Sequence, residues 1–247
     1  MRTKYISLIA CLAFVAAPEI AFPESVYTKY VPSIDQKIIL FKRGKKKFQA
    51  SEGCGPVAAA MVLGYWQTQR GVKNLLAKGY TGKSHPYRAI RKLYKELKTK
   101  KAPGKANLAS FTLPRSFYKG LKKRVKGKLV KVKRMRNLRK WGKRKAELKK
   151  QLKKKNPVIL LKWKERKDGC LGKSSKGWNL IKNISYAHYF VAVGFKGKNV
   201  AIMPGWADKD KSASSSFSVH KRDSYSHAIC TFSELKKANP GLFWLQR

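Results

Sequence analysis

Acidic side chains are scarce in this 247-residue chain, which has 12 Asp and Glu against 58 Lys and Arg and a formal net charge of +46. Charge of one sign repels itself and costs stability at low ionic strength, and a polyanion relieves that cost. The balance therefore predicts anionic neighbours, although nucleic acid, anionic lipid and acidic polymers fit it equally. Because 43% of the residues are hydrophobic and 11% aromatic, a purely disordered basic tail is excluded.

Histidine and cysteine are also few, with four of each. A zinc site needs clustered Cys, His or carboxylate side chains, and His85, His220 and His227 have no ligand-like partners at a useful spacing. The sequence also lacks a phosphate-cradling glycine loop and a dinucleotide fingerprint. We therefore expect neither a metal nor a cofactor.

A long apolar run is missing as well. The stretch over residues 6–17 is shorter than the roughly 20 apolar residues that a membrane span needs. It follows the basic start Met1-Arg2-Thr3-Lys4, an arrangement more typical of a secretory signal than of a buried helix. We predict a signal peptide over residues 1–25, cleaved at about position 17–25. The protein is then secreted, periplasmic or envelope-associated, with a single domain over 26–247.

Removal of the signal takes Cys11 away and leaves Cys54, Cys170 and Cys230. Three cysteines in an oxidising compartment predict one disulfide and one thiol. The surroundings of Cys54 make it the odd one, so we predict a disulfide between Cys170 and Cys230. The alternative is that all three are reduced, as in a compartment that is not oxidising.

Helical patterns early in the mature chain and strand patterns late in it predict an α+β domain. Pro56, followed by strong helix formers, predicts a buried helix from near Gly55 to about Gln69. The remaining patterns predict helices over 86–98, 114–125, 141–152 and 233–238, strands over 37–41, 129–132, 157–161, 189–195, 200–203 and 242–245, and loops over 167–179 and 207–218.

Residues 115–155 form a Lys/Arg-rich stretch that contains 21 basic residues and one acidic residue, Glu147. Apolar residues recur through it at strand and helix spacing. That pattern favours ordinary elements with a solvated basic face over a floppy tail.

Three residues far apart in the sequence have side chains suited to thiol chemistry. Cys54 precedes a helix start, where free amides and the helix dipole favour a thiolate and lower its pKa. His188 opens an apolar strand and is able to accept the thiol proton. Gln49, five residues before Cys54, is positioned to donate an amide N–H to a developing oxyanion.

These pieces resemble the papain-like cysteine peptidases of the bacteriocin-processing (double-glycine leader peptidase) type, in their secreted branch. The matching segments are Gln49 with residues 54–61, the Pro-containing turn at 156–160 and the histidine strand at 188–195. The resemblance covers most of residues 35–247. It implies a papain-like fold, in which the helix carrying the cysteine packs on an antiparallel sheet, and a secreted thiol hydrolase acting on peptides or proteins.

The sequence departs from this family where an Asp or Asn normally orients the imidazole. Met203 stands at that place, before Pro204, and a thioether is a poor acceptor for the ring N–H. Asp208, Asp210, a backbone carbonyl or water would then have to replace it. Trp206 either shields the site or packs in the core.

The departure leaves two classes of function open. One is a cysteine peptidase, expected as a monomer, whose basic face holds it near anionic polymers or an anionic membrane surface. The other is an inactive papain-like domain that acts as a cationic binding module. A nucleic-acid binder is disfavoured by the export signal and the lack of a recognition motif, although non-specific nucleic-acid binding fits the charge.

Overall fold

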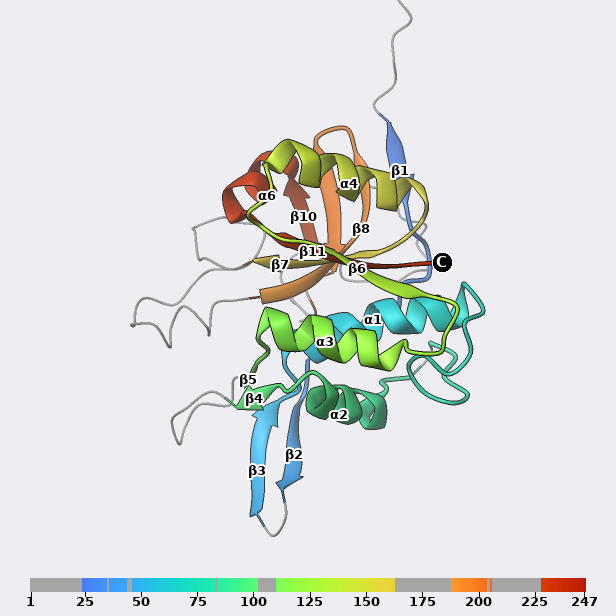
Figure 1. Cartoon of the computed structure of the whole chain (residues 1–247), viewed down its shortest axis with the longest axis vertical. Coiled ribbons are helices and arrows are strands. Elements are labelled where there is room, and N and C mark those ends of the chain that lie inside the picture. The colour runs from blue at the N-terminus through green and yellow to red at the C-terminus, as the bar shows by residue number, and fades with distance from the viewer. Residues whose placement is uncertain are drawn as a thin grey trace, which may run out of the picture.

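The computed structural model describes residues 24–34, 36–43, 46–82, 84–101, 110–162, 188–203, 205 and 228–247. Within these ranges an antiparallel seven-stranded sheet forms the centre of the molecule (Figure 1). Its strands are β1 (Ser25–Tyr27), β6 (Lys131–Met135), β7 (Val158–Lys162), β8 (His188–Lys196), β9 (Asn199–Met203), β10 (Ala228–Thr231) and β11 (Gly241–Gln246). Their order is β10-β9-β8-β7-β11-β6, with β1 paired to β8.

Helices cover both faces of this sheet. The helices are α1 (Cys54–Thr68), α2 (Tyr87–Glu96), α3 (Pro114–Arg124), α4 (Trp141–Lys153) and α6 (Phe232–Ala238). Figure 1 shows α4 and α6 on one side of the sheet and α1, α2 and α3 on the other. Two small antiparallel pairs lie beyond α1, namely β2 (Ile38–Arg43) with β3 (Lys46–Ser51), and β4 (Lys100–Lys101) with β5 (Ser110–Phe111).

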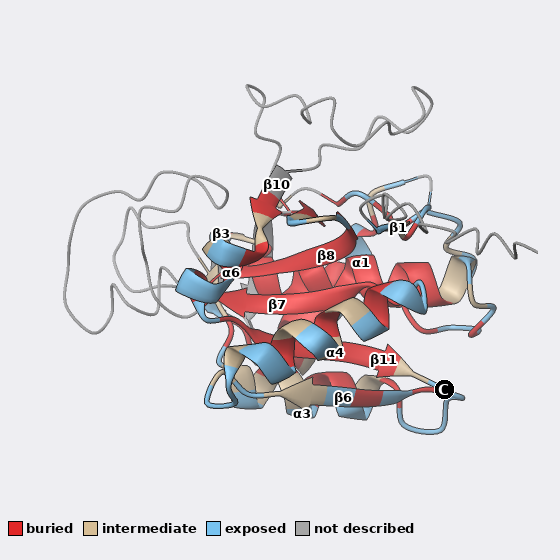
Figure 2. Cartoon of the chain, turned by 90° about the horizontal axis from the view of Figure 1, so that it is seen from above, coloured by how far each residue is buried: buried red, intermediate tan, exposed pale blue. Residues whose placement is uncertain are grey.

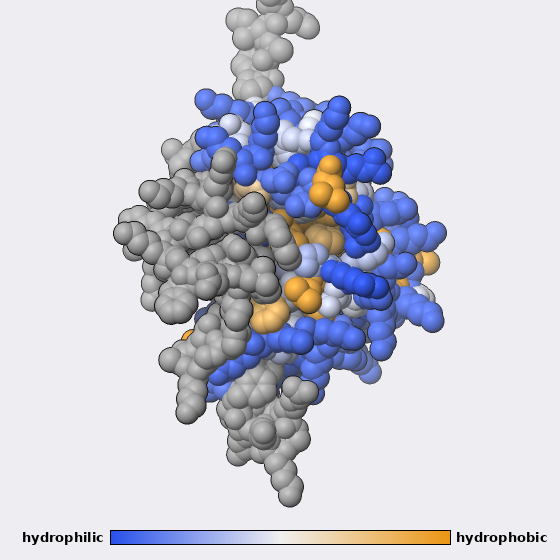
Figure 3. All heavy atoms as spheres, turned by 60° about the vertical axis from the view of Figure 1, so that its left-hand side comes forward, coloured by the Kyte–Doolittle hydropathy of each residue, from blue (hydrophilic) through white to orange (hydrophobic). Residues whose placement is uncertain are grey.

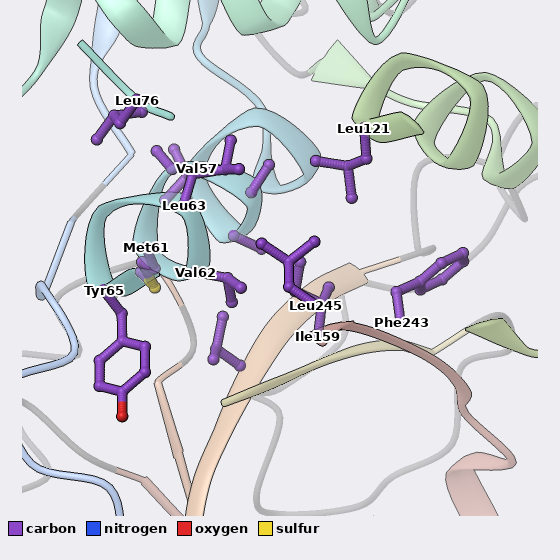
Figure 4. Packing of buried hydrophobic residues seen from close by; sticks show 14 of the residues in the cluster. Val57, Met61, Val62, Leu63, Tyr65, Leu76, Leu121, Ile159, Phe243 and Leu245 are labelled. Atoms are coloured by element: carbon purple, nitrogen blue, oxygen red, sulfur yellow. The ribbon is translucent and has the colours of Figure 1, made fainter. Parts of the chain in front are cut away.

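Helix α1 is the most deeply buried helix of the described chain, with every residue from Cys54 to Trp66 inside the protein. A helix that is apolar all round must be enclosed on all sides, and α1 packs against β7 and β8 of the sheet and against α2. In Figure 4, Val57, Met61 and Val62 of α1 lie among side chains from the sheet and from α3. The sequence pattern of strong helix formers without charges therefore fixes α1 in the middle of the larger core.

The opposite face of the sheet has its own core. Strand alternation sends Phe190 and Ala192 of β8 to this side, where they pack with Leu148 and Leu152 of α4. The outer face of α4 is exposed, as the pale blue segments in Figure 2 show. The Lys/Arg-rich stretch at 115–155 thus contributes α3, β6 and α4 to the fold, which confirms that it is built of ordinary elements.

One cation of that stretch is used inside the protein rather than on its surface. Arg144 of α4 is only 2% exposed. Its guanidinium donates hydrogen bonds to the carbonyl oxygens of Arg139 at 2.9 Å and Pro240 at 2.6 Å, and to the side-chain oxygen of Asn239. Asn239 ends α6 in the left-handed region, so Arg144 ties α4 to the turn between α6 and β11.

The predicted α+β class, with the helix carrying Cys54 packed on an antiparallel sheet, is confirmed. All five predicted helices and all six predicted strands are present. The strand predicted over 129–132 occurs at 131–135, and β1, β3, β4, β5 and β10 were not predicted. Among the described residues no helix is long and apolar enough to span a membrane. Most of the predicted signal peptide and the loops predicted over 167–179 and 207–218 lie outside the described residues.

We predict that Arg144→Ala lowers the free energy of unfolding by about 2–3 kcal/mol, because the three hydrogen bonds of a buried guanidinium are lost, one of them to the buried Pro240. The neighbouring Lys143 is exposed, so Lys143→Ala should change the unfolding free energy by no more than about 0.5 kcal/mol. Urea unfolding of the two variants measures the difference. Equal values for both would show that the Arg144 hydrogen bonds contribute nothing to stability.

Candidate active site

Cys54 lies at the amino-terminal end of α1, where the local sequence forces a sharp entry into the helix. Gly53 before it has φ of 82°, a conformation that glycine adopts at little cost. A side chain at Gly55 would bring its Cβ to 2.7 Å from the Thr112 hydroxyl, so glycine is needed there too. Cys54 itself is 8% exposed and its sulfur is in no disulfide.

Backbone N–H groups of three residues act on the Cys54 sulfur and favour its ionised form. Those of Gly55 and Cys54 belong to the first turn of α1, and that of Tyr189 belongs to β8. Burial raises the pKa of the thiol to about 11, although these N–H groups act to lower it. We expected the helix start to lower the pKa of the Cys54 thiol. That expectation is wrong, because the loss of solvent around the buried thiol raises its pKa by more than the backbone amides lower it. At neutral pH the resting group is a thiol.

Tyr189 is the residue through which the sheet meets the cysteine. Its hydroxyl donates a hydrogen bond to the carbonyl oxygen of Thr112 at 3.2 Å, and its ring stacks on Phe117 with 4.3 Å between ring centroids. Burial raises the pKa of Tyr189, and the nearby charge of an ionised Cys54 raises it further. The hydroxyl therefore stays protonated and holds β8 against the start of α3. The sequence pattern predicts Tyr189 only as part of a core strand and gives no sign of its contact with Cys54.

His188 is the first residue of β8 and so the direct neighbour of the amide that contacts the sulfur. The side chain is buried, and its ring stacks on Phe190 with 5.9 Å between centroids and 13° between planes. Phe190 belongs to the core on the α4 side of the sheet, whereas Tyr189 belongs to the core on the α1 side. The base role of His188 stays a prediction.

Gln49 lies in β3, opposite Leu40 in the β2–β3 pair, and its residue is exposed. An exposed amide is accessible to a substrate, and the proposed oxyanion role remains a prediction. Glu52 and Gly53 connect this strand, which ends at Ser51, to α1. Ser51 accepts a hydrogen bond from the N–H of Gly53 at 3.2 Å and donates one to the side-chain oxygen of Gln36 at 3.0 Å.

A buried carboxylate lies two residues before the cysteine and was missed by sequence analysis. Glu52 is 0% exposed, and its Oε2 accepts the N–H of Lys37 at 3.1 Å and lies 3.3 Å from Nε2 of His85. Its Oε1 has no hydrogen-bond partner in the described structure. The sequence near His85 contains no ligand-like partner for it, and only the fold brings its ring to Glu52. The pair fixes the chain that leads into Cys54.

The place predicted for a third catalytic residue lies at the end of β9. Met203 is buried in the α1-side core and pairs with Val191 of β8. Two residues on, the carbonyl of Gly205 accepts the N–H of Gln36 at 2.8 Å. The same segment at 36–37 thus holds both the end of β9 and the turn before Cys54.

Several predicted site residues lie outside the described residues. They are Cys170, Pro204, Trp206, Asp208 and Asp210. The predicted disulfide and the replacement of Met203 by an aspartate therefore stay predictions, and Cys230 is buried in β10. Among the residues that the structure does describe, no three His, Cys, Asp or Glu side chains are grouped as metal ligands.

We predict that Cys54 reacts slowly with iodoacetamide at pH 7 in the absence of substrate. Because the pKa is raised to about 11, the thiolate fraction and the rate should rise about tenfold per pH unit until the pH approaches that value. Mass spectrometry of the alkylated peptide measures the rate across the range over which the protein stays folded. A rate that is already maximal at pH 7 would contradict the dominance of burial.

We also predict that Glu52→Ala lowers the free energy of unfolding by about 2–3 kcal/mol, since the N–H of Lys37 and the His85 ring lose the buried carboxylate that they contact. Glu147→Ala is the matched control, because Glu147 makes one hydrogen bond, to Gln151, on the half-exposed side of α4. Its loss should cost about 1 kcal/mol or less. A Glu52→Ala variant as stable as the control would show that the buried pair does not hold the turn.

Known proteins share this fold. A putative C39-like peptidase from Bacillus anthracis matches with a TM-score of 0.50 and 14% identity, over 91% of this chain and 98% of that one. A fragment of prointerpain A from Prevotella intermedia, in a cysteine-to-alanine mutant form, matches with a TM-score of 0.50 and 13% identity, over 89% and 71% of the two chains. No curated protein matches the sequence significantly. The model of the Peptidase_C39 like family matches residues 29–228, and with most of its length matched this chain belongs to that family.

Proposed function

We propose that this protein is a cysteine peptidase in which Cys54 is the nucleophile. The observation that carries the proposal is the cluster of backbone N–H groups from Cys54, Gly55 and Tyr189 on one buried sulfur, in a chain of the Peptidase_C39 like family. Such a cluster stabilises negative charge on sulfur as soon as the proton leaves. A cysteine that served only to fill the core would gain nothing from it.

The raised pKa of the thiol means that the reaction needs a base, and His188 is our candidate. In the proposed cycle the Cys54 proton passes to the imidazole while sulfur attacks the peptide carbonyl carbon. The C–N bond then breaks and the amine leaves with the proton from the imidazolium. Water next attacks the thioester, His188 accepts its proton and returns it to sulfur, and the acid product departs. We assign Gln49 and the Cys54 N–H to the oxyanion.

The imidazole also needs an acceptor that keeps its tautomer, and Met203 does not supply one. Asp208 or Asp210 is our candidate for that role. A triad that lacks its orienting group still retains catalysis from the nucleophile, the base and the oxyanion donors. We therefore expect a working but slow enzyme.

We further propose that the signal at 1–25 directs the peptidase to the cell exterior or envelope, where a Cys170–Cys230 disulfide forms and the protein acts as a monomer. The net charge of +46 supports attachment to anionic polymers or an anionic membrane surface there. Non-specific nucleic-acid binding follows from the same charge.

The second candidate function is an inactive cationic binding domain. Two observations favour it, namely the thiol pKa of about 11 and the apolar Met203 in place of an acceptor. This alternative predicts polyanion binding with no peptide cleavage.

Digestion of an unbiased peptide library separates the two functions. We expect cleavage by the wild type and a loss of about 1,000-fold or more in Cys54→Ala and in His188→Ala. Groups that act as a unit are not additive, so the double variant should be no slower than either single variant. Product peptides are counted by mass spectrometry, with unfolding curves as the control for folding. Full activity in Cys54→Ala would exclude the proposed nucleophile, and no cleavage by the wild type would favour the binding domain.

A further inference from the structure

A groove of about 860 Å³ runs between α3, β6 and the start of β11. Four apolar residues line it and are called its floor below, namely the buried Leu161 and Phe243, the half-buried Met135 and the exposed Leu113. The side of the molecule that Figure 3 turns to the viewer shows hydrophobic surface set in a hollow among hydrophilic side chains. Apolar surface left in a hollow on a protein of such high charge marks a binding site for another molecule.

The groove leads to the candidate active site. Leu161 in its floor pairs in the sheet with Tyr189, whose N–H contacts the Cys54 sulfur. Phe117 connects the two places a second time, since its ring stacks on Tyr189 and meets Phe243 edge to face at 5.1 Å. These contacts place the floor of the groove beside Tyr189, the residue whose backbone meets Cys54.

The groove is basic along its rim. Arg115, Lys119, Lys122, Arg134 and Arg136 line it, and among the described residues no acidic side chain does. Arg134 lies over the ring of Tyr118 at 4.1 Å, which holds its guanidinium in place. Arg134 of β6 and Arg136 just after it carry planar guanidinium groups suited to pairing with carboxylates.

We infer that the groove binds an acidic stretch of the peptide substrate next to the bond that is cleaved. The inference rests on the proposed peptidase function and adds the class of substrate to it. Asp and Glu side chains of the substrate pair with the basic rim, while its apolar side chains cover the floor. Charge complementarity selects the acidic partner, and the pairing of Leu161 with Tyr189 supports its place beside the nucleophile.

A peptide fits the groove better than a nucleic acid or an acidic polysaccharide does. Polymers that carry phosphate or carboxylate groups pair with the basic residues of the rim. They leave the four apolar floor residues without an apolar partner. A peptide that alternates acidic and apolar side chains satisfies both the rim and the floor.

Binding tests the inference apart from catalysis. The probes are two fluorescent peptides of one length and apolar content, one with Asp and Glu and the other with Asn and Gln in their place. All proteins carry Cys54→Ala, so the probe stays intact. The groove variant is Lys119→Glu with Arg136→Glu. The control is Lys126→Glu with Lys128→Glu, which removes equal charge at exposed positions after α3.

We expect the acidic peptide to bind about tenfold or more weakly to the groove variant than to the control, and the control to bind it within about twofold of the parent. The neutral peptide should bind weakly to all three proteins. In the protein with Cys54 restored, the groove variant should raise KM for an acidic substrate and leave kcat nearly unchanged.

If the groove variant and the control lost affinity for the acidic peptide equally, the inference would be overturned, because binding would then depend on the overall charge of the protein. An oligonucleotide that loses affinity for the groove variant while the acidic peptide does not would also overturn it. If the acidic peptide binds in the groove but the wild type cleaves no peptide, the inference about the groove stands and the proposed peptidase function is rejected. Cleavage that is indifferent to acidic residues and to the groove variant would keep the peptidase and reject the groove.

Discussion

The enclosure of α1 against β7 and β8 is the constraint on which the rest of this structure depends. Because α1 is apolar on every side, it has to be covered by the sheet, by α2 and by α3. This packing brings the first turn of the helix to the beginning of β8, where the Tyr189 N–H meets the Cys54 sulfur. The site is therefore a consequence of core packing rather than of a loop laid over the surface.

Two opposing effects act on the sulfur as a result. The amides favour the thiolate and burial favours the thiol, and burial wins, with a pKa of about 11. A cysteine of this kind is a poor nucleophile in the absence of substrate, and it needs a base close to the thiol when a substrate binds. The burial of Glu52, two residues before Cys54, costs further folding free energy. Its contacts with Lys37 and His85 offset that cost.

Sequence patterns predicted every helix of the described chain, because each has apolar residues at helical spacing, a proline at its start or a run of strong helix formers. Cys54 and His188 stood out for the same reason, since each opens an element. The short strands β1, β4, β5 and β10 have too few residues to show alternation. The contact of Glu52 with His85 joins positions 33 residues apart, and the groove depends on how α3 crosses β6. Neither follows from local pattern.

The central claim is that Cys54 attacks the substrate and His188 serves as its base. Labelling with a peptidyl fluoromethyl ketone built on a sequence that the protein cleaves tests it most directly, because this reagent alkylates a nucleophile engaged in the site. Mass spectrometry of the digested protein should find one equivalent of label, on Cys54, and a much slower reaction in His188→Ala. Label on another residue, or equally fast labelling of Cys54 in His188→Ala, would contradict the account.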